Sequence, residues 1–93
     1  MLTAIVLIRT VVDRIAEVAE AIAALDGVTE VYSVTGAVDL IAVVRVREHD
    51  QLAEVIAGGV STIPGVVGTD THVAFRAYSK HDLEAAFSLG DPA

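Results

Sequence analysis

The apolar positions of this chain change their spacing along the sequence, and each change marks an expected element. Residues 2–8 are almost continuously apolar over a short run, which is typical of a strand buried on both faces. From Asp13 onward the apolar residues recur at the spacing of one helix face, and Asp26 and Gly27 are expected to end that helix. The members of this face are Ile15, Val18, Ala19, Ile22 and Leu25.

Two further strands are predicted over residues 28–34 and 38–46. The first of them carries Thr29, Glu30 and Ser33 and is more polar, as expected for an edge strand. The second is apolar on both faces, because residues that alternate along a strand point to opposite sides. One face holds Val38, Leu40, Ala42, Val44 and Val46, and the other holds Ile41 and Val43.

A second helix is expected to start at His49 and Asp50, with Asp50 as its cap, and to end at Pro64 and Gly65. Its apolar stripe is Leu52, Val55, Ile56 and Ile63. Gly58 and Gly59 conflict with a long helix, since glycine inside a helix costs about 1 kcal/mol relative to alanine. They indicate an early helix end or a kink, or else a close backbone approach by a neighbouring subunit.

The last expected strand covers residues 66–78. Ser79 is then expected to cap a short terminal helix that docks through Leu83, Ala86 and Phe87, before a frayed tail over residues 90–93. We therefore predict one ligand-binding and oligomerisation domain over residues 1–93, with its core in 2–78 and a C-terminal helix and tail in 79–93.

The predicted order is β-α-β-β-α-β, the split β-α-β plan of ferredoxin-like α+β folds. In that plan the first and third strands are central and the second and fourth are edges of a four-stranded antiparallel sheet. The two helices cover one face of the sheet. The other apolar face is then expected to be buried by a second subunit, as in a dimeric α+β barrel.

Composition strengthens the expectation of an oligomer. Ninety-three residues suffice for one core, yet 54% of them are hydrophobic and the mean hydropathy is +0.62. No apolar run reaches the roughly 18–20 residues of a membrane span, and no signal peptide is recognisable. The chain has no cysteine, which excludes disulfides and thiolate chemistry and is compatible with a cytoplasmic location. We expect a cytoplasmic homo-oligomer that does not enter membranes.

Charge argues against nucleic-acid binding. The net charge is −7, and the six basic residues are scattered rather than gathered on one face. The three histidines are too far apart in the sequence to suggest a metal motif, and no nucleophile–base pair stands out. The sequence thus predicts no metal, no cofactor and no catalytic residues.

The turn over residues 34–40 is the strongest candidate for a binding site. Gly36 supplies backbone freedom, and Asp39 places a carboxylate beside apolar surface. Asp39 can accept from the ammonium of an amino acid, while backbone N–H groups near Gly36 and a hydroxyl of Thr69 or Thr71 can donate to its carboxylate. The alternative is that these residues have only structural roles. Asp39 would then make a local Asx-type hydrogen bond, Gly36 would permit the hairpin turn, and the two threonines would be present for their β-propensity. Asp70 should point away from both threonines.

The order of elements, the turn Val34-Thr35-Gly36-x-x-Asp39-Leu40 and the junction Ile63-Pro64-Gly65-Val66 with Thr69 and Thr71 resemble one family. They are similar to the effector-binding (RAM) domain of the Lrp/AsnC, or feast/famine, transcription regulators. The resemblance covers about residues 2–78, and the ending Tyr78-Ser79-x-x-Asp82-Leu83-Glu84 resembles stand-alone members without a helix-turn-helix.

The resemblance implies an amino-acid or similar small effector at the interface between dimers. It implies the ligand-binding residues Gly36, Ala37, Val38, Asp39, Thr69 and Thr71. It also implies a sheet-to-sheet dimer that goes on to form tetramers or octamers. Val38 departs from the family, which often has an aromatic residue before the aspartate.

The leading interpretation is a non-catalytic effector-binding and oligomerisation module that modulates transcription by assembling with itself or with a full-length, DNA-binding Lrp/AsnC relative. One alternative is an enzyme of the monooxygenase or isomerase type on the same dimeric plan, with His72 or Asp39 as base. Another is a structural module without a ligand. An ACT domain is disfavoured because Arg9-Thr10-Val11-Val12 follows the first strand, where that domain usually has glycine.

Overall fold

The computed structural model describes residues 1–80, which form a sheet and two helices. The strands are β1 (Leu2–Thr10), β2 (Val28–Ser33), β3 (Leu40–Val46) and β4 (Val66–Val73). The helices are α1 (Ile15–Ala23) and α2 (His49–Ala57), and two short 3-10 helices, η1 (Val12–Arg14) and η2 (Val60–Thr62), adjoin them. The predicted order β-α-β-β-α-β is confirmed.

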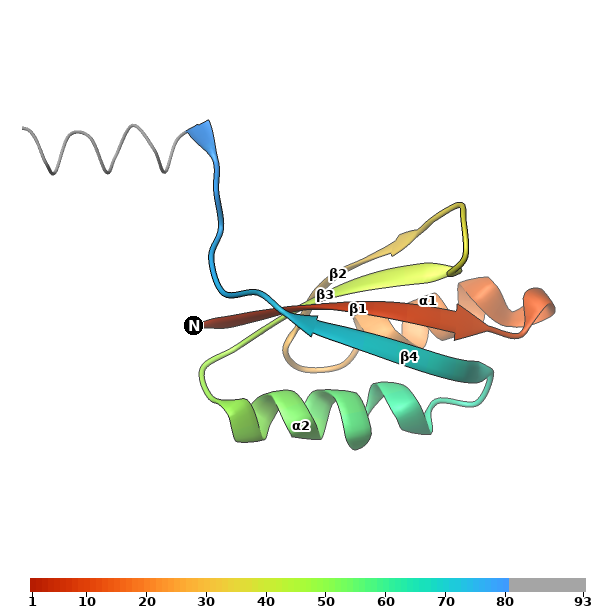
Figure 1. Cartoon of the computed structure of the whole chain (residues 1–93). Coiled ribbons are helices and arrows are strands. Elements are labelled where there is room, and N and C mark those ends of the chain that lie inside the picture. Colours follow the sequence, from red (N-terminus) through yellow and green to blue (C-terminus); the bar gives the residue numbers. More distant parts are fainter. Residues whose placement is uncertain (81–93) are drawn as a thin grey trace, which may run out of the picture.

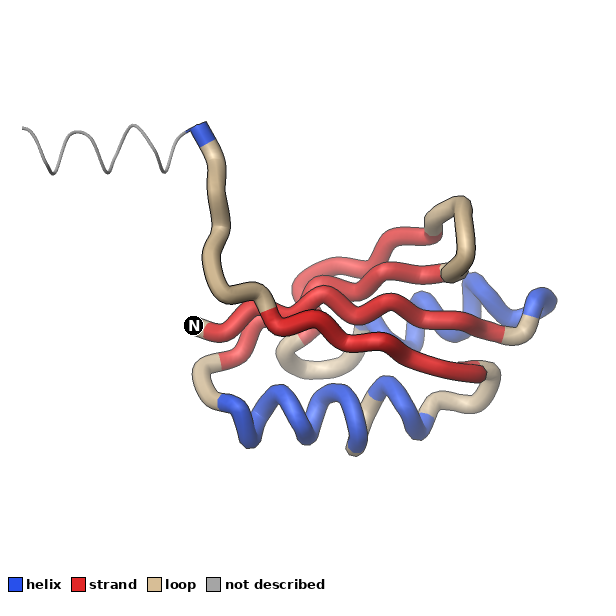
Figure 2. Tube along the Cα trace, viewed as in Figure 1, coloured by secondary structure: helices blue, strands red, loops and turns tan. Residues whose placement is uncertain are grey.

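The four strands form one antiparallel sheet in the order β2-β3-β1-β4 (Figure 1). The first and third strands are therefore central, as their doubly apolar patterns predicted. Both helices lie on the same side of the sheet, and the opposite side is left uncovered (Figure 2). This is the ferredoxin-like α+β arrangement.

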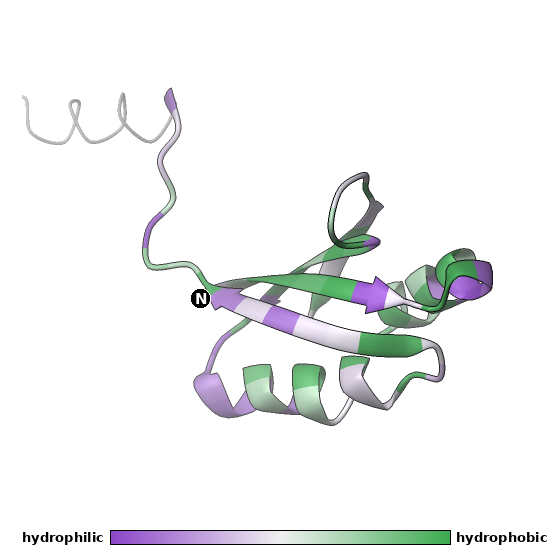
Figure 3. Cartoon of the chain, turned by 45° about the vertical axis from the view of Figure 1, so that its right-hand side comes forward, coloured by the Kyte–Doolittle hydropathy of each residue, from purple (hydrophilic) through white to green (hydrophobic). Residues whose placement is uncertain are grey.

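The core lies between the helices and the sheet. Alternate residues of the central strands point into it, as the geometry of a strand requires. The pairing of β1 with β3 sets Ile8 opposite Leu40 and Leu2 opposite Val46, so the buried residues of the two strands lie side by side. In Figure 3 β1 is hydrophobic along most of its length, whereas β4 becomes polar after its first residues. The buried apolar residues are Ala4, Val6, Ile8, Val18, Ile22, Leu40, Ala42, Val44, Val46, Leu52 and Val60.

The start and end of α2 differ from the prediction. Glu48, not Asp50, is the N-cap, and it forms a capping box with Gln51. The helix ends at Ala57 with Gly58 as its C-cap, well before Pro64, so the glycine pair marks an early helix end. A Cβ on Gly59 would lie 3.0 Å from Leu25 Cδ1, so this glycine also permits close packing inside the subunit.

The predicted fourth strand is too long by five residues. It ends at Val73, where Ala74 N–H still donates to the carbonyl of Thr3 at 2.8 Å. Residues after Ala74 have almost no part of β1 left to pair with. The alternating sequence pattern up to Tyr78 is therefore not enough to form a strand. Phe75 is 100% exposed there. The terminal helix and tail expected after Ser79 lie outside the described residues, apart from Lys80.

Candidate functional site

The turn between β2 and β3 stands at one end of the sheet, and backbone hydrogen bonds close it. Val34 N–H donates to the carbonyl of Asp39 at 3.0 Å. Gly36 has a φ of 108°, in the left-handed region, while nothing lies within 4 Å of the position of a Cβ. Glycine is thus needed here for its backbone conformation and not for space.

Asp39 joins this turn to the end of β1. Its N–H donates to the carbonyl of Ile8 at 2.9 Å, and its Oδ2 accepts from the N–H of Thr10 at 2.8 Å. Thr10 is 7% exposed, so Asp39 supplies the acceptor for a buried donor. The carboxylate is therefore fixed by a contact with β1, not by the local Asx-type bond considered as the alternative.

Several polar groups of the turn are left available. Within residues 1–80, the N–H groups of Gly36, Ala37 and Val38 donate to no other group, and only the Oδ2 atom of Asp39 accepts a bond. A partly buried carboxylate oxygen and free N–H donors on one turn can bind the ammonium and the carboxylate of one small zwitterion.

The two threonines lie on β4, on the helix-covered face of the sheet. Thr69 pairs with Ile8 and Thr71 with Val6, and both partners are fully buried there. Asp70 and His72 point to the other face, as predicted, with His72 Nε2 3.2 Å from Asp70 Oδ2.

The structure does not bring the threonines to the turn within one chain. β1 lies between β3 and β4, and two strand spacings amount to about 10 Å. A ligand that contacts both Asp39 and a threonine hydroxyl would therefore need groups from a second chain or a long reach across β1.

Metal ligands are not gathered anywhere in the described part: no group of three or more histidine, cysteine, aspartate or glutamate residues could hold an ion there. No helix among residues 1–80 is long and apolar enough to cross a membrane. Tyr32 O–H donates to Glu30 on the uncovered face, and this bond raises the pKa of Tyr32.

Residues 3–83 match the family model of the Lrp/AsnC ligand binding domain, which is most of the chain. The chain belongs to this family. The resemblance seen in the sequence is confirmed, and the family is that of regulatory domains that bind ligands.

Relatives of this Lrp/AsnC domain occur with and without additional sequence. The uncharacterized HTH-type transcriptional regulator YugG of Bacillus subtilis is 37% identical over 75 residues, which cover 81% of this chain and 44% of that protein. The chain thus spans less than half of this curated relative. A solved protein from Thermus thermophilus is 48% identical with a TM-score of 0.82, covering 86% of this chain and 100% of that one.

A more distant Lrp/AsnC structure shares the fold. The feast or famine regulatory protein of M. tuberculosis, solved in complex with L-methionine, is 22% identical with a TM-score of 0.70. The alignment covers 86% of this chain and 54% of that protein.

Sequence reasoning missed a concave region at the other end of β3 from the turn. A cavity of about 480 Å³ lies between α2 and the connection from α1 to β2. No motif indicated it, because its residues come from four separate segments, at Met1 and around Gly27, Val46 and Val55.

Proposed function

We propose that this Lrp/AsnC domain is a non-catalytic effector-binding module that takes an amino acid at the turn of residues 36–39. The observation that carries this proposal is that only one carboxylate oxygen of Asp39 accepts a hydrogen bond, from Thr10 N–H. The N–H groups of Gly36, Ala37 and Val38 beside it donate to no other group within residues 1–80. The methionine bound by the M. tuberculosis relative supports an amino acid as the ligand class.

In the proposed complex the two charged groups of the amino acid meet different parts of the turn. Its ammonium pairs with the free oxygen of Asp39, and its carboxylate accepts from the N–H groups of Gly36 and Ala37. Val38 is half-buried beside them and limits the room for the effector side chain. Thr69 and Thr71 join this site only through a second chain.

The uncovered sheet face supports the assembly that such a site requires. It presents Ile5 at 40% exposure together with the half-buried Leu7, Ile41 and Val43. An apolar sheet face of this kind is stabilised when it packs against another sheet. We expect a sheet-to-sheet dimer, and tetramers or octamers built from it.

Effector binding would then act on transcription through assembly in the cytoplasm. An amino acid that binds between chains favours one oligomeric state over another, with a coupling free energy of about 1–3 kcal/mol. The domain would assemble with itself or with a full-length, DNA-binding Lrp/AsnC regulator. The net charge of −7 gives the domain no basic face of its own for DNA.

Calorimetric titration with each of the twenty amino acids tests this proposal on wild type and Asp39→Asn. Asparagine keeps an oxygen for Thr10 N–H but presents an amide to the ammonium, so effector affinity should fall at least ten-fold. Asp50→Asn, an exposed aspartate on α2, is the matched control. Absence of binding to wild type would refute the effector role, and unchanged binding to Asp39→Asn would remove the turn from the site.

A further inference from the structure

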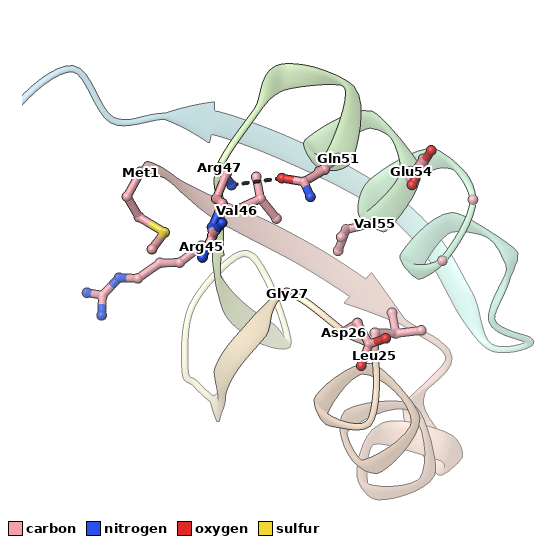
Figure 4. Close-up of a pocket in the computed structure, with 12 residues that line it drawn as sticks. Met1, Leu25, Asp26, Gly27, Arg45, Val46, Arg47, Gln51, Glu54 and Val55 are labelled. Carbon is pink, nitrogen blue, oxygen red and sulfur yellow. Dashed lines mark hydrogen bonds between the residues drawn. The ribbon is translucent and has the colours of Figure 1, made fainter.

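The cavity at the far end of β3 is a formed site that the proposed effector site does not use. Its volume of about 480 Å³ falls within the range of small-molecule pockets. Its apolar lining comes from Leu25, Val46 and Val55. Gly27 lies between them, and a Cβ there would be 3.0 Å from Val55 Cγ2 and 3.1 Å from Val46 Cγ1 (Figure 4).

Hydrogen bonds fix the framework of the cavity on both sides. Arg45 N–H donates to the carbonyl of Gly27 at 2.8 Å, which ties the connection after α1 to β3. Gln51 Oε1 accepts from the N–H groups of Arg47 and Glu48 at 2.9 Å and 3.0 Å, which fixes the connection between β3 and α2. A lining fixed in this way needs little rearrangement to bind a ligand.

The charged groups around the cavity are separated by sign. Figure 4 shows Arg47 toward one end of the cavity, near Met1, and Asp26 and Glu54 toward the other, on two different elements. Arg45 contributes its backbone to the lining, while the alternation along β3 places its side chain on the uncovered face of the sheet. Within residues 1–80 the side chains of Arg47, Asp26 and Glu54 have no ion-pair or hydrogen-bond partner. The Gln51 side-chain NH₂ likewise donates to no group there, because only its oxygen is used.

From this arrangement we infer a second binding site, for a linear molecule with a carboxylate at one end, an ammonium at the other and an apolar spacer between them. The carboxylate is bound by the Arg47 guanidinium and the Gln51 NH₂. The ammonium is bound by Asp26 and Glu54, and the spacer lies on Val46 and Val55. The α-ammonium and α-carboxylate of an amino acid do not fit this pattern by themselves, since both groups are attached to the same carbon.

Amide chemical shifts of the labelled full chain can test this site with ε-aminocaproate as the probe. Hexanoate and hexylamine each carry one of its two charges, and all three are titrated to about 10 mM. We expect ε-aminocaproate to shift the amides of Gly27, Val46 and Gln51, with an affinity at least three-fold above that of either single-charge probe. Equal affinity for hexanoate or hexylamine, or no shift with any probe, overturns the inference.

Glu54→Gln separates charge recognition from shape. It should weaken ε-aminocaproate binding about three-fold and leave hexanoate binding unchanged. Glu17→Gln is the same change at an exposed position of α1, and it should alter the affinity for neither ε-aminocaproate nor hexanoate. A loss of hexanoate affinity in Glu54→Gln would contradict the assigned role of Glu54.

Asp39→Asn distinguishes the two sites. This variant should bind ε-aminocaproate with the same affinity as wild type, whether or not it has lost amino-acid binding at the turn. If Asp39→Asn abolishes the ε-aminocaproate shifts, the probe binds at the turn, and the second site is refuted while the effector proposal stands.

Discussion

The carboxylate of Asp39 accepts a hydrogen bond from the backbone N–H of Thr10 at 2.8 Å, although 29 positions separate the two residues. One oxygen thus completes the pairing of a buried donor at the end of a central strand. The same residue serves the stability of the fold and the proposed effector site.

Asp39→Ala should lower the free energy of unfolding by about 1–3 kcal/mol, because it leaves the Thr10 N–H buried without an acceptor. Asp39→Asn should cost much less, since its amide oxygen can accept the same bond. Urea denaturation at one fixed protein concentration measures both variants. Equal losses for the two variants would show that the charge of Asp39, not its acceptor oxygen, supports the fold.

Gly27→Ala should destabilise the chain more than Gly36→Ala. Both glycines have a positive φ, 93° and 108°, so both substitutions carry the left-handed penalty of about 1–2 kcal/mol. Only at Gly27 would the new methyl group press on Val46 and Val55, which adds about 1 kcal/mol or more. Thermal unfolding of the two variants decides the order, and a larger effect at Gly36 would contradict it.

Val43→Glu should weaken the assembly, because it places a charge on the uncovered sheet face that we propose to be buried between subunits. Size-exclusion chromatography with light scattering should show a smaller particle than wild type. Ala53→Glu, on an exposed position of α2, is the control and should leave the particle size unchanged. A wild-type particle of monomer mass would rule out the sheet-to-sheet dimer.

Glu30→Gln should shift the titration of Tyr32 to lower pH. The hydrogen bond to Glu30 raises the pKa of Tyr32, so it favours the neutral phenol in the folded chain. The resulting stabilisation is present below the ordinary tyrosine pKa of about 10 and is lost as the pH rises through the folded value. Tyrosinate absorbance of wild type against Glu30→Gln measures this, with Glu17→Gln as the control. Superimposable curves would contradict the pairing.

The sheet could be read from the sequence because burial on both faces leaves a pattern along the strand. Residues 2–8 and the alternation over residues 38–46 marked β1 and β3 as central, and their pairing confirms it, although β3 begins only at Leu40. The end of β4 was missed because it depends on where β1 stops. The cap of α2 was misplaced by two residues because Glu48 and Asp50 both suit a helix start, and the capping box with Gln51 decides between them.

The candidate sites could be predicted only in part from the sequence. The turn was proposed as a site because its glycine and aspartate are close in sequence, but the bond from Thr10 to Asp39 depends on tertiary pairing. The distance from the turn to the threonines of β4 likewise follows from strand order. The cavity left no local signal, since Asp26, Val46 and Glu54 come together only after folding.

Strand β3 connects the two regions to which we assign ligands. It begins beside Asp39 and ends at Val46, so the turn and the second cavity lie about 20 Å apart at its two ends. Molecules bound at both ends could not touch. Any influence of one on the affinity of the other would by thermodynamic linkage act equally in both directions.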